Sequence, residues 1–215
     1  MGVAGPMERI LEGGVVAIMR ARSPDQLLDA AKAVLEGGVE AIEVTMTTPG
    51  ALDVIRAATT RFGDKVLFGV GSVLDPETAR AAMLAGAQFV VCPTLKRATI
   101  QMCQRYAVPV VPGAYTPTEI LDAWEAGADA VKVFPANAGG PGYLKAIKGP
   151  LPQVRLSAVG GVNAENAAAF IRAGADFLGV GGDLVNQKLL ESRSFDAITE
   201  RARVFRQQVD EGRSK

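Results

Sequence analysis

A glycine-containing helix end that runs directly into a short apolar segment recurs along this chain and constrains its fold more than any other feature. Glycine can adopt the left-handed backbone conformation that closes a helix. A short apolar run just after it is typical of a buried parallel strand. The four copies span residues 35–44, 84–91, 125–133 and 172–180. The chain is therefore predicted to repeat one helix–strand unit.

The helix starts are marked as well. Ser, Thr or Asp followed by Pro combines a good cap with the residue best suited to the first helical position. Such pairs stand at residues 23–24, 48–49, 75–76 and 116–117. A last helix is expected from about Phe195 to Val209. The residues up to about Pro6 and the tail Glu211–Lys215 are expected to fray.

Eight apolar runs in this chain of 215 residues qualify as strands. They are Val15–Met19, Ala41–Thr45, Val66–Val70, Phe89–Cys92, Val108–Val111, Ala130–Phe134, Val154–Ala158 and Phe177–Val180. Alternation of these runs with helices predicts an α/β fold, a single (β/α)8 TIM barrel, with residues 1–215 as one domain. A doubly wound open sheet is the alternative, but it would not need eight near-equal units. Functional residues of such barrels lie at the carboxyl ends of the strands.

The chain contains no histidine, which excludes Ser-His-Asp and Cys-His catalysis and histidine-rich zinc or iron sites. Proton transfer must then use Glu, Asp, Lys, Tyr or water. A metal held only by carboxylates stays open. The 23 basic and 23 acidic side chains give a net charge of zero. That balance argues against nucleic acid and against a membrane surface as partners.

The cellular location is predicted from three further features. No apolar run approaches the roughly 18 residues that a membrane span needs. The first eleven residues carry Glu8 and Arg9 and have no signal-peptide core. Cys92 and Cys103 are the two cysteines, without CxxC spacing. A reduced, cytoplasmic protein is therefore expected.

Lys132 carries the strongest chemical signal, because it alone among the lysines lies inside an apolar strand. Strand alternation places Val131 and Val133 against the helices, so Lys132 should point into the barrel. Burial disfavours a charged ammonium, and a neutral amine attacks a ketone to give an imine. The alternative is a structural lysine that pairs with an interior carboxylate.

Glu43 is the natural partner of this lysine. It lies in another apolar strand, with Ala41 and Thr45 on the same face. A carboxylate inside a barrel is unusual. Glu43 could form a purely structural salt bridge with Lys132, or it could act as the general acid and base that imine chemistry requires. Two ionisable groups of opposite sign at strand ends favour the functional interpretation.

Two glycine-rich loops follow the last two predicted strands. Gly160 and Gly161 lie in the first loop, and Gly181 and Gly182 lie in the second. In many barrels these loops bind phosphate through backbone N–H groups and a helix N-terminus. Tight turns explain most glycine-rich loops, but this position in the order of strands favours an anion site.

Three further residues close predicted strands. Arg20 and Ser72 could hold a substrate carboxylate at the mouth of the barrel, although Arg20 is equally well explained as a solvated surface charge. Cys92 is expected to be a small buried residue, since nothing in the sequence activates its thiol.

Five segments together resemble the 2-keto-3-deoxy-6-phosphogluconate aldolase family, which includes the phosphogalactonate and 4-hydroxy-2-oxoglutarate aldolases. They are Glu-Gly-Gly-Val at 36–39, Ile-Glu-Val-Thr at 42–45, Gly-Val-Gly-Ser-Val-Leu-Asp-Pro at 69–76, Val-Lys-Val-Phe-Pro-Ala at 131–136 and Val-Gly-Gly-Val at 159–162. The resemblance runs in order from about residue 15 to residue 185. It implies a class I aldolase, free of metal and of cofactors, that forms a homotrimer of small barrels.

The resemblance also implies roles for individual residues. It gives the Schiff base to Lys132 and water-assisted proton transfer to Glu43. Ser72 stands where the family usually has a threonine that holds the pyruvyl carboxylate, and Arg20 would assist it. Pro93 and Phe134 would line the pocket. The phosphate would lie near the two glycine-rich loops, at Gly160, Gly161, Gly181 and Gly182.

Two departures from the family pattern concern substrate binding. Thr47, in the expected binding set, stands where many members have an arginine, and Arg20 could compensate for it. Gly182 stands where many members have a serine, and Asp183 follows it. The second change removes a hydroxyl donor and adds an anion near the expected phosphate.

The residues and the resemblance together predict cleavage of a small keto-acid substrate, a 2-keto-3-deoxy sugar acid with a phosphate at C6. The products would be pyruvate and an aldehyde such as glyceraldehyde 3-phosphate. Two alternatives stay open. One is a sugar-phosphate epimerase or isomerase that forms no imine, and the other is a non-catalytic barrel that binds a sugar acid.

Overall fold

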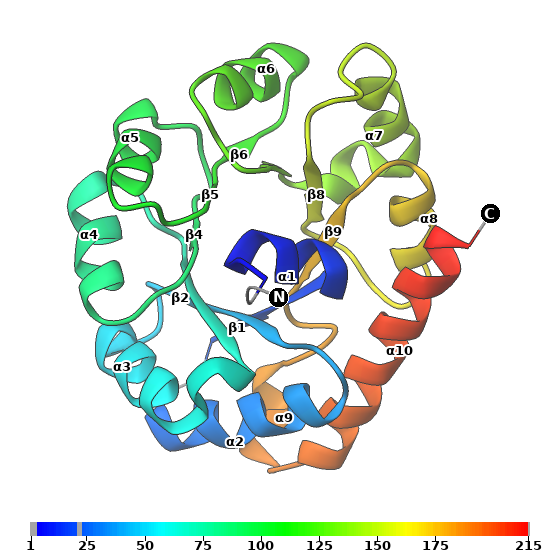
Figure 1. Ribbon diagram of the computed structural model, residues 1–215. Helices are drawn as coiled ribbons and strands as arrows, with labels where there is room; N and C mark the ends of the chain where they lie inside the picture. The colour runs from blue at the N-terminus through cyan, green and yellow to red at the C-terminus, as the bar shows by residue number, and fades with distance from the viewer. Residues whose placement is uncertain (1–3, 21–22, 215) are drawn as a thin grey trace.

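The computed structural model describes residues 4–20 and 23–214, and it shows a ring of parallel strands surrounded by helices (Figure 1). Nine strands of these residues form one sheet in the order β5-β4-β3-β2-β1-β9-β8-β7-β6. They are β1 Val15–Met19, β2 Ala41–Thr45, β3 Leu67–Gly71, β4 Val90–Val91, β5 Val110–Val111, β6 Gly113–Ala114, β7 Val131–Val133, β8 Leu156–Val159 and β9 Phe177–Val180.

The ring closes through one short segment of chain. β5 pairs with β4 on one side and β6 pairs with β7 on the other, while Pro112 separates β5 from β6. The Pro112 carbonyl accepts a hydrogen bond from the Lys132 N–H at 2.9 Å. Residues 110–114 therefore replace the fifth strand of the predicted barrel. The (β/α)8 prediction is confirmed, and the open sheet is wrong. All eight predicted strand regions are found: three match the bounds of β1, β2 and β9, and the other five differ by one or two residues at their ends.

The helices pack around the outside of the ring, with α1 as the exception (Figure 1). They are α1 Pro6–Gly13, α2 Pro24–Glu36, α3 Ala51–Phe62, α4 Pro76–Leu84, α5 Arg97–Arg105, α6 Pro117–Glu125, α7 Gly140–Lys148, α8 Ala167–Arg172, α9 Gln187–Glu191 and α10 Phe195–Arg213, with 3-10 turns at Gly63–Lys65 and Ala136–Ala138.

Three of the four predicted helix starts are confirmed by their caps. The side chains of Ser23, Asp75 and Thr116 each accept a hydrogen bond from the backbone N–H three residues on. The start predicted at residues 48–49 is wrong. The Thr48 N–H donates to the carbonyl of Thr45 in a turn, and α3 begins only after Gly50, which caps it in the left-handed conformation.

Two layers of apolar side chains account for the alternation along the strands. The outer layer joins the strands to the surrounding helices and contains Val131 and Val133. The inner layer fills the barrel and contains Ala130. The expectation that Val131 and Val133 face the helices while Lys132 points inward is therefore confirmed.

Helix α1, which the sequence reasoning did not predict, closes the barrel at the amino ends of the strands. It lies in the middle of the ring (Figure 1) and contacts β1, β2 and β9. Its buried residues Met7 and Ile10 belong to the inner apolar layer. The Gly5 N–H donates to the Glu8 carboxylate at 2.8 Å and so caps the helix. Of the stretch expected to fray at this end, residues 1–3 lie outside the described residues.

The expected fraying of the C-terminal tail is wrong for residues 211–214. Helix α10 continues to Arg213, whose guanidinium donates to the backbone carbonyl of Glu12 at 2.8 Å. Gly212 is buried, and a Cβ on it would come within 2.6 Å of the Ile171 side chain. The absence of a side chain at this position lets the end of α10 pack onto α8. Lys215 lies outside the described residues.

No helix within residues 4–20 and 23–214 has the length and apolar character that crossing a membrane requires.

The structure predicts that α1 is essential for stability. Ile10 is fully buried in the inner layer, so Ile10→Ala should lower the free energy of unfolding by about 2–5 kcal/mol. Chemical denaturation of the variant and of wild type measures this difference. Glu12→Ala, at an exposed position of the same helix, is the matched control and should change stability by less than about 0.5 kcal/mol. Equal stabilities of the two variants would contradict the packing of α1 into the barrel.

Candidate active site

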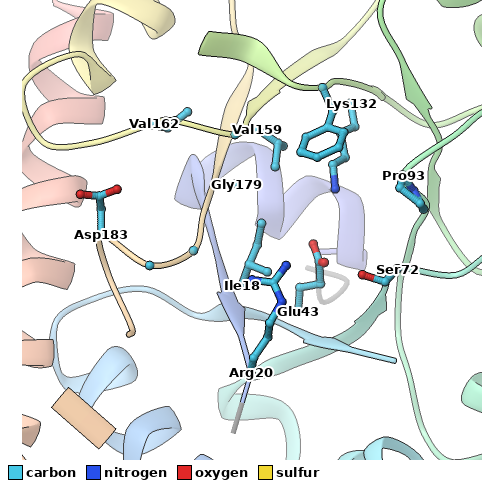
Figure 2. Close-up of a pocket in the computed structure, with 15 residues that line it drawn as sticks. Ile18, Arg20, Glu43, Ser72, Pro93, Lys132, Val159, Val162, Gly179 and Asp183 are labelled. Atoms are coloured by element: carbon cyan, nitrogen blue, oxygen red, sulfur yellow. The ribbon is translucent and has the colours of Figure 1, made fainter. Parts of the chain in front are cut away.

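A cavity of about 240 Å³ opens at the carboxyl ends of the strands, where Figure 2 shows its lining side chains. Ten of the eleven predicted site residues line it. They are Arg20, Glu43, Ser72, Pro93, Lys132, Phe134, Gly160, Gly161, Gly181 and Gly182. Segments as far apart as residues 20 and 182 therefore meet at one place, as the barrel prediction requires.

Thr47 is the predicted residue that the cavity lining does not include. β2 ends at Thr45, and the turn that follows leaves Thr47 exposed. Its hydroxyl lies 2.8 Å from the hydroxyl of Thr45, in a contact between two neighbours of the same turn. The geometry gives Thr47 no direct contact with a molecule in this cavity.

Lys132 projects from β7 into the cavity, and only 6% of the residue is exposed. Its ammonium lies 4.8 Å from the centroid of the Phe134 ring, close enough for the attraction between a cation and the face of an aromatic ring. Phe134 is itself 39% exposed at the mouth. The lysine therefore has an open path to a ligand and a ring that fixes its direction.

Glu43 projects from β2, and its carboxylate faces Lys132 across the cavity (Figure 2). Burial raises the pKa of Glu43 above its ordinary value of 4.5, while the positive charges of Lys132 and Arg20 partly oppose that rise. Among the described residues, no hydrogen bond or ion pair ties this carboxylate to either cation. The gap between Glu43 and Lys132 leaves room for a reacting group.

The backbone of the neighbouring strand β3 leaves space for the Glu43 side chain. A Cβ built on Gly71, the last residue of β3, would fall 2.3 Å from the Glu43 carboxyl carbon. Glycine at this position therefore lets the carboxylate lie against the backbone of the neighbouring strand. Ser72 follows with φ of 60°, a left-handed conformation that is uncommon for a residue with a side chain and is often found at functional sites. Its hydroxyl points into the cavity beside Glu43 (Figure 2).

The opposite side of the cavity is built from the two glycine-rich loops. Gly160 and Gly161 both have positive φ, and a Cβ on Gly161 would come within 2.4 Å of the Asn137 side chain. The Arg20 guanidinium lies beside Gly181, 3.9 Å from where its Cβ would be. Asp183 borders the cavity on the side away from Lys132 (Figure 2). This end therefore presents backbone N–H groups, one cation and one anion.

Besides Asp183, four lining residues were not among the predicted site residues. They are Ile18, Val159, Val162 and Gly179. Ile18, Val159 and Gly179 lie at or near the carboxyl ends of β1, β8 and β9. Their place in the strand order is the signal that would have found them, because apolar residues and glycine carry no chemical signal of their own.

Neither cysteine belongs to this cavity lining. Burial raises the pKa of the Cys92 thiol to about 12, so it stays protonated and a poor nucleophile. The expectation that Cys92 is a small buried residue is confirmed. Within the described part of the chain, no three Cys, Asp or Glu side chains gather in a way that could hold a metal ion.

The site thus joins a buried amine, a buried carboxylate of raised pKa and a mouth with groups suited to anions. An amine in this setting can form an imine with a carbonyl compound, and the carboxylate can exchange protons with the bound molecule. The fold and the site define a TIM-barrel enzyme of the Schiff-base type.

Comparison with known proteins agrees with this class. The family model "KDPG and KHG aldolase" matches residues 7–201. The 2-dehydro-3-deoxy-6-phosphogalactonate aldolase of Escherichia coli K12 is 41% identical over 79% of this chain and 83% of its own. The KHG/KDPG aldolase of the same organism is 35% identical over 89% and 90%. The Legionella pneumophila KDPG aldolase, solved with pyruvate captured as a covalent carbinolamine, superposes with a TM-score of 0.88 at 28% identity, covering 94% of this chain and 98% of that one.

The chain belongs to the KDPG and KHG aldolase family. It is a carbon–carbon lyase, a class I aldolase that works through a Schiff base to pyruvate. The resemblance noted in the sequence and the predicted class of enzyme are both confirmed.

The environment of Glu43 predicts an effect of pH on stability. Because the pKa of the carboxyl is raised in the folded state, the native protein binds more protons than the unfolded chain above pH 4.5. Stability is therefore lost as pH rises through the window between the unfolded and folded pKa values. Glu43→Gln, which cannot ionise, should escape this loss and melt at a higher temperature than wild type at neutral pH.

Melting temperatures of both proteins over a pH series from about 4 to 8 test this expectation. The difference should be smallest at the acidic end and should grow as pH rises. Glu77→Gln, at an exposed glutamate of α4, is the control and should show little change. A wild type that is more stable than Glu43→Gln at neutral pH would show that attraction to Lys132 and Arg20 outweighs the cost of burial.

Proposed function

We propose that Lys132 and Glu43 carry out the cleavage together. The Lys132 amine adds to the C2 carbonyl of a 2-keto-3-deoxy acid, and loss of water gives an iminium. Glu43, acting through a water molecule, removes the proton of the C4 hydroxyl. The C3–C4 bond then breaks, the aldehyde leaves, and the electron pair passes to the iminium to form an enamine. The enamine takes a proton at C3, and hydrolysis releases pyruvate and the free amine.

The observation that carries this proposal is the buried amine facing a buried carboxylate across an open cavity. Removing two charges from water costs energy that a structural pair recovers only with good contacts. Lys132 and Glu43 make no direct ion pair with one another in the described chain. Their burial is better explained by a substrate that fills the gap. The iminium accepts the electron pair, so the mechanism needs neither a metal nor a cofactor.

The remaining lining residues hold the two ends of the substrate. Ser72 and Arg20 bind the carboxylate next to the keto group, which charge-assisted hydrogen bonds make strong. Pro93 and Phe134 cover the pyruvyl part. The loops at Gly160, Gly161, Gly181 and Gly182 receive the far end through their N–H groups.

The proposed substrate is a 2-keto-3-deoxy sugar acid with a phosphate at C6. This choice rests on the names of the relatives, which act on 6-phosphogalactonate and phosphogluconate derivatives. The glycine-rich loops of the cavity fit a phosphate. Asp183 opposes it, and we therefore propose that selection for the phosphate is weaker than in relatives with a serine at position 182.

The protein is proposed to form a homotrimer in the cytoplasm. Leu74 and Leu84 are 60% and 68% exposed, and large exposed apolar side chains are suited to a subunit interface. Cys92 and Cys103 are free thiols, which fits a reducing compartment.

Reduction of the imine tests the proposed mechanism. Incubation with pyruvate and borohydride should attach the three-carbon unit covalently to Lys132, since borohydride converts the imine to a stable amine. Mass spectrometry of peptides locates the adduct. Lys148, whose ammonium bonds to Asp176 at 3.0 Å outside the cavity, is the internal control and should stay unmodified. An adduct on a different lysine, or none at all, would refute the role of Lys132.

The phosphate proposal is tested by restoring a hydroxyl at position 182. A Cβ on Gly182 meets no atom within 4 Å, so Gly182→Ser should fold without strain. A hydrogen bond to a charged oxygen contributes roughly 1.5–3 kcal/mol, so the serine should raise the preference for a phosphorylated substrate about tenfold or more. The measurement compares kcat/KM for matched phosphorylated and unphosphorylated 2-keto-3-deoxy acids.

Gly182→Ala is the matched control, because it adds a Cβ without a hydroxyl and should leave the preference unchanged. The opposing result is a wild type that already prefers the phosphorylated substrate by about a thousandfold or more, with no gain from the serine. Backbone N–H groups would then account for the specificity alone.

A further inference from the structure

Ser157 presents a hydroxyl that the mechanism above does not use. It lies on β8 directly opposite Lys132 of β7 in the strand register. Only 1% of the residue is exposed, and its Oγ has no hydrogen-bond partner among the atoms of the described chain. Leaving a hydroxyl without a partner in an apolar interior is costly. The Ser157 hydroxyl therefore needs a hydrogen-bond partner that the protein itself does not provide.

A small cavity lies next to this hydroxyl, inside the barrel and beneath the substrate cavity. Its volume is about 10 Å³, near the minimum space that a single water molecule occupies. Ser157 and Glu43 are its two polar walls, while the remaining lining residues are apolar or glycine, among them Ile10 from α1. Glu43, Val159 and Gly179 line both this cavity and the substrate cavity, so Glu43 stands at the boundary between them.

We propose that Ser157 and Glu43 hold one buried water molecule in this inner cavity, and that Ser157 is a positioning residue for the lyase reaction. The Ser157 hydroxyl donates to the water, and the water donates to the Glu43 carboxylate. Two polar partners are the minimum that a buried water needs. The inference rests on the proposed role of Glu43 in proton transfer. It adds a hydrogen bond that holds the Glu43 carboxylate from the side of the inner cavity.

The water acts on Glu43 in two ways. It holds the carboxylate in one orientation, since no other hydrogen bond to this side chain is found in the described residues. It also stabilises the ionised form, because a hydrogen bond donated to a carboxylate favours its charged state. In cleavage, Glu43 must be ionised to take the C4 proton. Loss of the water should therefore weaken the enzyme most at low pH.

The other groups that face Glu43 do not depend on Ser157. Lys132 on β7 and Arg20 after β1 are the cations whose charge reaches the carboxylate, and the Cys92 thiol after β4 is kept protonated by its burial. β3 contributes Gly71, which has no side chain to titrate. A change in the pH profile on substitution of Ser157 is therefore assigned to the hydroxyl and its water.

The test compares Ser157→Ala with a control that loses an equivalent hydroxyl elsewhere. Thr99 on α5 is 1% exposed and its hydroxyl is likewise unpartnered, but it lies outside both cavities, so Thr99→Val is the matched control. The quantity measured is kcat against pH, because kcat reports ionisations within the enzyme–substrate complex. By that stage Lys132 is already engaged in the imine and does not obscure Glu43.

The expected result is a selective loss on the acidic side. Ser157→Ala should lower kcat by about tenfold on the acidic limb, the loss that follows from one charge-assisted hydrogen bond, with a change of about twofold or less on the plateau. Thr99→Val should keep the wild-type profile. The yield of the pyruvate–borohydride adduct should be the same in all three proteins. An unchanged acidic limb in Ser157→Ala, or a uniform loss at every pH, would overturn the inference.

A high-resolution crystal structure of the wild-type protein gives a second, independent readout should Ser157→Ala fail to fold. Electron density for one water within hydrogen-bonding distance of Ser157 and Glu43 supports the inference, and an empty inner cavity overturns it. This result does not depend on catalysis. Failure of the borohydride trapping in wild type would instead refute the proposed mechanism, so the two failures are distinguishable.

Discussion

The burial of two opposite charges inside an otherwise apolar barrel is the constraint on which this structure depends. Lys132 and Glu43 are 6% and 3% exposed, and each comes from a strand whose neighbouring residues pack against the helices. Burying such groups costs several kcal/mol each unless they are compensated. The barrel offsets part of this cost by placing them on facing strands, near Arg20, in a cavity where a charged substrate can complete the compensation.

The rest of the barrel keeps this region rigid. Helix α1 and the inner apolar layer fill the barrel at the amino ends of the strands, so polar groups and open space are concentrated at the other end. Gly71 gives the Glu43 side chain its place against β3. The Phe134 ring limits the directions open to Lys132. A catalytic pair held by strands is positioned more precisely than one held by loops.

The sequence predicted those site residues that combine a reactive side chain with a clear place in an apolar strand. Lys132 and Glu43 stand out because a charged residue interrupts an apolar strand, and the period of two residues fixes the side on which each one lies. The glycine-rich loops were located by the order of the strands. The eight strand regions and the barrel likewise follow from the short apolar runs that alternate with helices, because such runs are typical of strands buried on both faces.

Other features depend on tertiary packing that no local pattern reveals. Helix α1 is only eight residues long, and helices this short are marginal by themselves. Burial of Met7 and Ile10 in the barrel stabilises it. The end of α10 can pack onto α8 because Gly212 has no side chain, and Ile171 of α8 leaves no room for one. Thr47 entered the predicted binding set through the family resemblance, although the predicted strand and β2 both end at Thr45. The turn after β2 leaves Thr47 exposed and outside the cavity lining.

Exchange of the methyl protons of pyruvate in D2O tests the joint action of Lys132 and Glu43 most directly. Imine formation at Lys132 makes these protons acidic, and Glu43 with its water moves them, so one proton NMR measurement reports both groups without an aldehyde. Wild type should replace the methyl protons with deuterium. Lys132→Met should exchange no faster than buffer, and Glu43→Gln should exchange about a hundredfold or more slowly than wild type, the range of general acid–base catalysis. Exchange at the wild-type rate in Lys132→Met would contradict a Schiff base at this residue.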